Sequence, residues 1–351
     1  MAREGAGDGN GAAPRPHLAA RVEDAIHAWR ERRARRRGLV PVLVPYPSYG
    51  GPGWVRLLGR VVLRRPDHDP RERIRGWRSF TTIHVSDAEV EVVAPDGSRH
   101  RVRTDRGGVL DARVEIELPA GWQRIPVRPV PDGDPVEVPV FVVAAGVRFG
   151  LLSDIDDTVM VTALPRPLLA AWNTFVLDEH ARSPVPGMAV LYERIVRAHP
   201  GAPVIYLSTG AWNVTPTLTR FLRRNLYPRG ALLLTDWGPT RDRLFRSGPQ
   251  HKRDELARLA DDFPALRWVL VGDDGQHDEE LYGEFARAHP DRVAVVAIRN
   301  LTPTEAVLAG GRSREGGKGA PIPWISAPDG AGLAGELARL GIVDEPGRGP
   351  A

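Results

Sequence analysis

Two hydrophobic patterns divide the chain, and the first is an alternation of apolar and polar positions. Between residues 39 and 146, short β-branched segments alternate in this way, as strands with one buried face do. Turn-forming residues such as Pro95-Asp96-Gly97 separate the segments. The alternation is clearest in residues 85–93, 100–103, 109–118 and 136–143. We therefore predict that residues 39–146 form a small antiparallel β-sandwich.

The second pattern begins after Gly146. Here short, nearly continuous apolar runs alternate with helical segments, which is typical of a parallel sheet buried on both faces. The predicted strands are 147–153, 202–208, 231–235, 268–271 and 293–298, and the predicted helices are 187–198, 215–225, 251–262 and 278–288. The sequence therefore predicts an α/β domain over residues 147–303.

The two ends of the chain follow neither pattern. We expect a disordered Gly/Ala/Pro-rich segment (1–17), a basic amphipathic helix (18–38) and a Gly/Pro-rich C-terminal tail (304–351). The helix is predicted because Val22, Ile26 and Trp29 recur at helical spacing among arginines. Within the tail, only residues 333–340 show a weak helical pattern.

Composition and charge narrow the possible functions. Hydrophobic residues make up 42% of the 351 residues, which is ordinary for a folded protein. Cysteine is absent, which excludes disulfides, thiolate zinc sites and a cysteine nucleophile. Residues 15–37 contain eight arginines and three acidic residues, a charge of +5, so the rest of the chain carries about −1 of the formal net charge of +4. The positive charge is thus local, which argues against extended nucleic-acid binding.

The lack of long apolar runs bears on the expected cellular location of the protein. The first twenty residues have no apolar core like that of a secretory signal. No apolar run approaches the roughly 18 residues that span a bilayer. We therefore expect a cytoplasmic protein. Peripheral binding to an anionic membrane surface is a second expectation, because a basic amphipathic helix can lie on such a surface. In the alternative, Trp29 packs on the β domain and the arginines are only solvated.

The main chemical signal lies where the first apolar run of the α/β region ends. Leu151-Leu152-Ser153 leads directly into Asp154, Asp156 and Thr158. At the carboxyl end of a strand in a doubly wound sheet, side chains reach the crevice where ligands bind. One carboxylate there can attack phosphorus while its neighbour protonates the leaving alkoxide, and both can share a magnesium ion. An acidic loop that caps a helix is the alternative interpretation.

Three further signals follow along the chain. Ser208 ends the second apolar run, and its hydroxyl is suited to bind a phosphoryl oxygen. Lys252 opens a helix and can neutralise a nucleophile and a phosphate. Asp273, Asp274 and Asp278 follow another apolar run and have the oxygen ligands that magnesium requires. Each signal has an ordinary structural alternative, but their combination and order predict a phosphatase.

These signals resemble the four motifs of the haloacid dehalogenase superfamily. The matching positions are Asp154-x-Asp156-x-Thr158, Ser208, Lys252, and Gly272-Asp273 followed by Asp278. The resemblance implies a Rossmann-like core with a parallel sheet, preceded here by the small β-sandwich. It also implies the catalytic roles: nucleophile for Asp154, general acid and base for Asp156, and phosphate binding for Ser208 and Lys252.

The same resemblance implies a magnesium site. Its ligands would be Asp154, the backbone carbonyl of Asp156, and Asp273. Either Asp278 or Asp274 would orient the shell around the metal, and the sequence leaves both open.

A narrower resemblance is to the actin patch protein type of phosphatidate phosphatase. It covers roughly residues 147–301 and includes non-catalytic positions, among them Trp172-Asn173-Thr174-Phe175, Pro186-Gly187-Met188, Trp212-Asn213 and Tyr282. Two positions near the expected substrate mouth depart from the family pattern. Thr209-Gly210-Ala211 stands where an Asn-Ser-Pro segment is typical, and Thr235 stands where a basic residue often precedes Asp-Trp.

This resemblance implies a magnesium-dependent phosphatase that hydrolyses phosphatidate to diacylglycerol and phosphate through an aspartyl-phosphate. The expected substrate-binding residues are Thr158, Thr209 and Arg166. Arg166 lies in an apolar segment, 164–172, which could admit an acyl chain or simply pack on the core. Two other functions remain open from the residues. One is a phosphatase for a soluble or protein-bound phosphoester, and the other is a lipid- or protein-binding module with an idle catalytic core.

Overall fold

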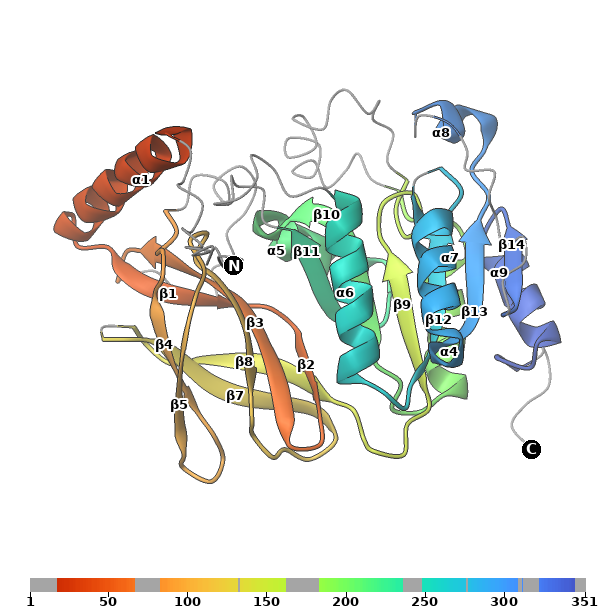
Figure 1. The fold of residues 1–351 in the computed structure, drawn as a ribbon, viewed down its shortest axis with the longest axis horizontal. Coiled ribbons are helices and arrows are strands. Elements are labelled where there is room, and N and C mark those ends of the chain that lie inside the picture. The colour runs from red at the N-terminus through yellow and green to blue at the C-terminus, as the bar shows by residue number, and fades with distance from the viewer. Residues whose placement is uncertain are drawn as a thin grey trace, which may run out of the picture.

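The structure is a computed structural model of the chain. It describes residues 18–66, 83–131, 133–161, 183–235, 248–275, 277–308, 311 and 322–344. Two sheets, one of eight strands and one of six, form its framework (Figure 1). In these residues no helix is both long and apolar enough to cross a bilayer.

The first sheet comes from the N-terminal part of the chain. Its strands are β1 (Val40–Pro45), β2 (Ser48–Gly51), β3 (Trp54–Arg64), β4 (Glu89–Val93), β5 (Arg99–Arg103), β6 (Val109–Val114), β7 (Gly121–Pro129) and β8 (Val136–Val142). The order is β1-β3-β2-β8-β7-β4-β5, with β6 paired to β3, and β2 pairs with β8 in parallel while the other pairs are antiparallel. Strand β1 also contacts β7 and β8, so the sheet folds over its own core.

The second sheet is entirely parallel in its pairings. Its strands are β9 (Phe149–Asp154), β10 (Val204–Ala211), β11 (Ala231–Thr235), β12 (Arg267–Asp273), β13 (Val293–Arg299) and β14 (Trp324–Ala327). They lie in the order β11-β10-β9-β12-β13-β14. Strand β9 therefore lies inside the sheet, between β10 and β12. The predicted combination of an antiparallel and a parallel sheet in a mixed α/β fold is confirmed.

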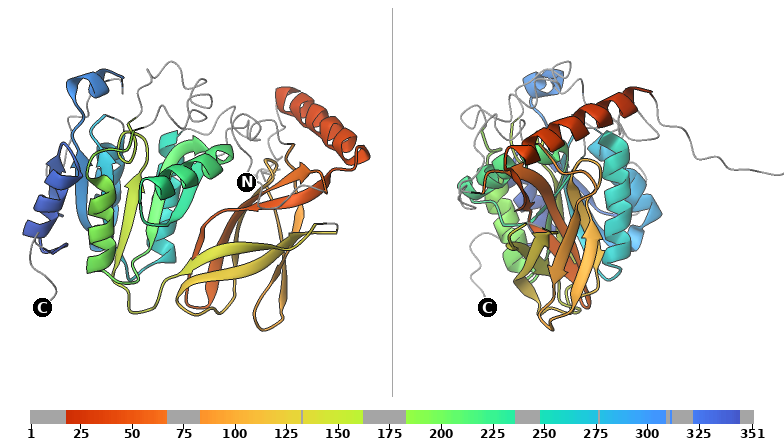
Figure 2. Two further views of the ribbon diagram at one scale, coloured as in Figure 1. Left: turned by 180° about the vertical axis from the view of Figure 1, so that it is seen from behind. Right: turned by 90° about the vertical axis from the view of Figure 1, so that its left-hand side faces the viewer.

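Helices cover both faces of the parallel sheet, which is why its strands are apolar along their whole length. These helices are α4 (Met188–Ala198), α5 (Thr215–Arg224), α6 (Gly248–Asp262), α7 (Asp278–Ala288) and α9 (Gly330–Arg339), with short 3₁₀ turns η2 (Trp212–Val214) and η3 (Pro290–Arg292). Helix α8 (Pro303–Leu308) instead lies beyond the carboxyl ends of the strands (Figure 1). In Figure 1 α6 and α7 lie on the near face, and Figure 2 shows α4 and α5 on the opposite face.

The C-terminal segment differs from the tail expected over residues 304–351. Strand β14 pairs with β13 at the edge of the sheet, and α9 packs on α4. The approach of the two helices is close, since a Cβ on Gly330 would lie 2.2 Å from the carbonyl carbon of Gly187. The prediction failed because β14 buries only Ile325 and Ala327, too few positions to show a periodic pattern.

Helix α1 (Leu18–Arg36) lies within the residues where an N-terminal helix was predicted, and it docks on the first sheet. Ala34 is buried in the core of that sheet, and the ring of His27 stacks on His84 at 3.7 Å. Trp29 and Ile26, by contrast, remain 57% and 55% exposed. The alternative in which Trp29 packs on the β domain is therefore wrong.

The two sheets share a hydrophobic core. Tyr49 and Trp54 of the first sheet contact Phe263, which follows α6, with ring centroids 5.7 and 5.5 Å apart. Alternate residues of β3 point to different sides: Trp54 and Leu58 join this shared core, whereas Leu57 joins the core of the first sheet. Strand β3 is consequently buried along nearly its whole length.

Candidate active site

Side chains from three neighbouring strands meet at the carboxyl edge of the parallel sheet. Asp154 is the last residue of β9, Asp273 is the last residue of β12, and Ser208 lies near the end of β10. All three are buried, with exposed fractions of 1% or less. Since parallel strands place their carboxyl ends at the same edge, the apolar runs that precede these residues bring them together.

Lys252 joins this edge from α6. Its Nζ atom donates to Oδ1 of Asp154 and to Oδ1 of Asp278, both at 2.6 Å. Burial by itself would lower the pKa of this lysine, but the two carboxylates outweigh burial and raise it above its ordinary value. The two carboxylates therefore favour the charged form of Lys252 next to the end of β9.

Asp154, Asp273 and Asp278 form what we call the acid cluster. One carboxylate oxygen from each lies within 4.8 Å of one from the others, and all three residues are buried. Burial, followed by repulsion from Asp278, raises the pKa of Asp154 well above its ordinary value, although Lys252 opposes this. The Oδ2 atom of Asp154 accepts no hydrogen bond from the described residues. Lys252 thus bonds to two of the three carboxylates of the acid cluster, and the three together could hold a metal ion.

A close approach of α7 to β12 builds the far side of the acid cluster. Asp278 is the first residue of α7, where the positive end of the helix dipole favours a carboxylate. A Cβ on Gly272 would lie 2.7 Å from Oδ2 of Asp278, so only glycine allows this approach. The backbone N–H of Asp273 also donates to that oxygen, at 3.4 Å.

Asp156 lies two residues beyond Asp154 and is held by Ser208. The Oγ atom of Ser208 donates to Oδ2 of Asp156 at 3.0 Å and accepts from the N–H of Gly210 at the same distance. Asp157, which follows Asp156, has a φ of +59°, a left-handed conformation that aspartate tolerates better than most residues. The hydrogen bond from Ser208 therefore holds Asp156 next to β10, just before this turn.

The remaining candidate residues differ in whether they lie close to the acid cluster. Thr158 is buried, and its Oγ1 lies 3.5 Å from Oδ2 of Asp273, at the limit of a hydrogen bond. Oδ1 of Asp274 accepts from the N–H of Leu301 at 2.8 Å and so ties down the loop after β13. Asp278 rather than Asp274 therefore lies in the acid cluster. Thr209 is partly exposed beside the start of α6, and Arg166 lies outside the described residues.

One residue of this region was missed from the sequence. Arg299, the last residue of β13, is buried and donates from Nη1 to the carbonyl oxygen of Asp157 at 2.6 Å. Its Nη2 pairs with Glu305 of α8 at 2.8 Å. An arginine that ends an apolar strand is a signal that could have revealed it, because β9 and β12 also end in polar site residues.

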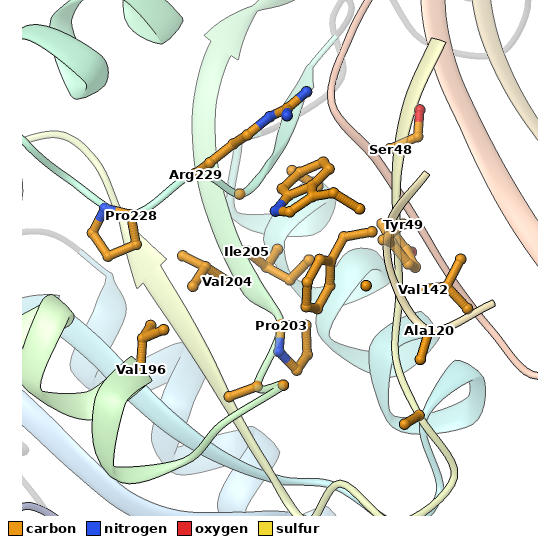
Figure 3. Close-up of a pocket in the computed structure, with 18 of the residues that line it drawn as sticks. Ser48, Tyr49, Ala120, Val142, Val196, Pro203, Val204, Ile205, Pro228 and Arg229 are labelled. Carbon is orange, nitrogen blue, oxygen red and sulfur yellow. The ribbon is translucent and has the colours of Figure 1, made fainter. Parts of the chain in front are cut away.

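A cavity of about 380 Å³ lies elsewhere, between the two sheets and at the amino ends of β10 and β11 (Figure 3). Its lining is mainly apolar and includes Val204, Tyr49 and Trp122. The guanidinium group of Arg229 lies over the ring of Trp122, 3.8 Å from its centre. No residue of the acid cluster lines this cavity, so it is separate from the candidate active site.

Fold and site together define an α/β protein with buried carboxylates and a lysine at the carboxyl edge of a parallel sheet. Residues 149–300 match the family model described as "Phosphatidate phosphatase APP1, catalytic domain". The family resemblance predicted from the motifs is thereby confirmed for this segment. The first sheet lies outside the matched residues.

Two curated relatives match stretches of about the same length as this segment. The phosphatidate phosphatase APP1 of Saccharomyces cerevisiae is 27% identical over 153 residues, and an uncharacterized protein of Schizosaccharomyces pombe is 25% identical over 152 residues. Each alignment covers 43% of this chain and 25% of the relative. Among solved structures, a carbohydrate acetylesterase from Xanthomonas citri covers 77% of this chain and 73% of its own at 11% identity, but its TM-score of 0.27 carries no argument.

Proposed function

We propose that this chain is a magnesium-dependent phosphatidate phosphatase that works through an aspartyl-phosphate on a haloacid dehalogenase-like core. The observation that carries the proposal is the contact of Lys252 with both Asp154 and Asp278 in the acid cluster. This arrangement lies within the segment that matches a phosphatidate phosphatase catalytic domain. A buried cation against a carboxylate at a strand end is suited to bind and transfer a phosphoryl group.

Asp154 is the proposed nucleophile. Its Oδ2, which accepts no hydrogen bond from the described residues, attacks phosphorus while the bond from phosphorus to the ester oxygen breaks. Asp156 gives its proton to the leaving alkoxide. In the second step Asp156 takes a proton from water, and the resulting hydroxide attacks phosphorus, releases phosphate and restores the Asp154 carboxylate. Lys252 offsets the negative charge that collects at Asp154 when the phosphoryl group approaches.

The residues of the acid cluster fit a magnesium ion. They supply only oxygen ligands, as magnesium requires, and two of the three buried carboxylates pair with Lys252. Asp154 and Asp273 would hold the ion with the backbone carbonyl of Asp156, and Asp278 would orient the shell. A bound magnesium ion would supply positive charge next to the transferring phosphoryl group.

Activity assays with a panel of phosphate esters test the substrate. We expect purified protein to release phosphate from phosphatidate in mixed micelles with Mg²⁺ and to lose this activity in excess EDTA. Phosphorylated sugars and phosphopeptides serve as the soluble and protein-bound comparisons. Faster turnover of a soluble ester would replace phosphatidate as the substrate but keep the chemistry, whereas no turnover of any ester would contradict both.

The proposal extends to an anionic membrane surface, which α1 is suited to bind. Ile26 and Trp29 are exposed apolar residues, and Arg33 lies over the ring of Trp29 at 5.8 Å. Arginines near an anionic surface contribute about 1 kcal/mol each. In Figures 1 and 2, α1 lies at the same end of the molecule as the carboxyl ends of the parallel strands. Binding through α1 would therefore turn the candidate active site toward the lipid.

Co-sedimentation with vesicles tests the membrane proposal. We expect deletion of residues 1–37, or the single change Trp29→Ala, to weaken binding to anionic vesicles, and added salt to weaken binding of the intact protein. Leu226→Ala is the matched control, because Leu226 is 81% exposed but lies in the α/β region. Equal binding by the deleted and intact proteins would show that α1 is only structural.

A further inference from the structure

Helix α6 is held at two places by two different buried networks. Near its start, Lys252 reaches the acid cluster. One turn later, Glu255 points to the first sheet and meets Arg56 of β3, with contacts of 2.7 and 3.1 Å from the two terminal nitrogens of the guanidinium group. Residues three apart on a helix are neighbours, so a force on Glu255 acts on the turn that carries Lys252.

Arg56 is rigidly fixed on its own side. It is 3% exposed, and it forms a bidentate pair with Asp111 of β6, with both nitrogen-to-oxygen distances at 2.6 Å. It also donates to the hydroxyl of Tyr49 at 2.6 Å. A guanidinium group with this many short contacts has one position, and its planar fork defines the direction of each bond.

The contact between Arg56 and Glu255 joins residues that are 199 positions apart in the chain. Glu255 lies in the segment that matches the family model, whereas Arg56 and its partner Asp111 precede that segment. The first sheet is therefore connected to α6 by a buried ion pair and not by apolar packing alone. This connection ends one helical turn from the lysine that contacts the proposed nucleophile.

We propose that Arg56 is a positioning residue: through Glu255 it sets the place of α6, and thereby the place of Lys252 relative to Asp154. The inference rests on the proposed function and makes the first sheet a part of the catalytic apparatus. The physical reason is that Nζ of Lys252 holds two carboxylates at 2.6 Å, so a shift of α6 breaks at least one contact. Misplacement of a catalytic group by about 1 Å can cost about 10²-fold in rate.

Arg56→Met tests the inference, because methionine fills the space of the stem without the charge. We expect kcat to fall about 10²-fold at a temperature where the variant is fully folded, with a smaller change in KM. Arg113→Gln is the matched control. Arg113 also reaches from β6 to α6, but it pairs with Asp262 at the last position of the helix, far from Lys252. Its kcat should stay within about twofold of wild type.

A double variant distinguishes a positioning role of Arg56 from a purely stabilising one. If Arg56 acts through Lys252, then Arg56→Met should cause no further loss of kcat in a Lys252→Met protein, since the group that it positions is gone. An equal loss in both backgrounds would overturn the inference, and so would a folded Arg56→Met variant with wild-type kcat. Should Arg56→Met fail to fold, Arg56→Lys decides in the same way, because lysine keeps the charge but not the fork.

Amide hydrogen exchange tests the inference even if the protein hydrolyses no ester. The lack of hydrolysis would contradict only the proposed function. We expect Arg56→Met, or Arg56→Lys in its place, to speed amide exchange in the first half of α6, around Lys252 and Glu255. Arg113→Gln should act only near Asp262. Unchanged exchange around Lys252 in the Arg56 variant would contradict the positioning role.

Discussion

Two buried charged networks lie on α6, and they are built in opposite ways. In the acid cluster, Lys252 bonds to two of the three carboxylates, those of Asp154 and Asp278. In the second network, which we call the arginine cluster, Arg56 is saturated by Asp111, Glu255 and Tyr49. Burial raises the pKa of Asp154 in the first network, whereas in the second the pair with Arg56 outweighs burial and lowers the pKa of Asp111.

The difference distinguishes a network of charges suited to bind a ligand from a network whose charges are compensated by other protein groups. A buried charge costs free energy unless hydrogen bonds and opposite charge compensate it. The arginine cluster meets this condition with groups of the protein alone, because Arg258 also pairs with Asp111 at 3.3 Å, so its role is to hold two parts of the fold together. In the acid cluster, Lys252 bonds to two of the three carboxylates, and under the proposed function a magnesium ion would add positive charge there. The following experiments challenge or sharpen this contrast, beginning with the largest expected effect.

Asp154→Asn should abolish phosphate release while the protein stays folded. The amide has nearly the volume of the carboxylate, but it cannot form an acyl-phosphate. Steady-state assays with phosphatidate and Mg²⁺ measure the loss, and thermal unfolding provides the control for folding. A variant with near-wild-type turnover would remove Asp154 from the mechanism and with it the main reason to regard the acid cluster as functional.

Asp156→Asn should lower kcat by about 10²–10⁴-fold, the usual contribution of a general acid and base. The side chain still fits beside Ser208, so substrate binding should change little. Esters with a better leaving group should recover part of the rate, because they need less help from a proton donor. An equal loss for good and poor leaving groups would argue against protonation by Asp156.

Glu255→Ala should destabilise the protein by about 3 kcal/mol, because removing one partner of a buried ion pair leaves the other charge poorly compensated. Urea unfolding measures the change. Arg113→Gln is the control, because Arg113 is about half exposed and its pair should contribute about 0–1 kcal/mol. If both variants lose equally little, the arginine cluster is not the complete structural network described above.

Asp273→Asn should have the opposite effect to Glu255→Ala. It should raise the free energy of unfolding by about 0.5–2 kcal/mol when EDTA is present. Burial and repulsion from Asp278 raise the pKa of Asp273, so the folded protein binds more protons than the unfolded chain does above about pH 4. As pH rises above about 4, the wild-type protein should therefore lose stability relative to the variant.

Magnesium should reverse this order. Wild type should gain thermal stability as Mg²⁺ is added, and Asp273→Asn should gain less, because the ion binds only the folded site. The variant should also need more Mg²⁺ for activity. A less stable Asp273→Asn protein in EDTA, or equal stabilisation of both by Mg²⁺, would contradict the description of the acid cluster as a network of charges suited to bind a ligand.

Much of the parallel sheet could be predicted from local patterns. Continuous apolar runs defined its first five strands, and the predicted bounds of β11 and α7 agree with the structure. The position of Asp154, Ser208 and Asp273 at one edge also followed, because each ends such a run and parallel strands align their carboxyl ends. Local sequence suffices here because the period of burial and the end of a strand are both local properties.

Other features depended on contacts between distant residues. The short strand β14 is defined by its pairing with β13, and the assignment of Asp278 rather than Asp274 to the acid cluster required the direction in which each side chain points. Arg299 contacts the turn after β9, 142 residues earlier in the chain. No periodicity marks such partners.

The sequence by itself determined the two kinds of sheet, the order of the polar strand ends and the basic helix at the N-terminus, because these follow from hydrophobic period, turn residues and local charge. Tertiary structure alone decided that α6 is held between the acid cluster and Arg56. In the sequence Arg56 is one arginine among many and Glu255 an ordinary helix residue. Only packing of the two sheets removes water from this pair, and burial is what turns a weak surface attraction into a strong positional constraint.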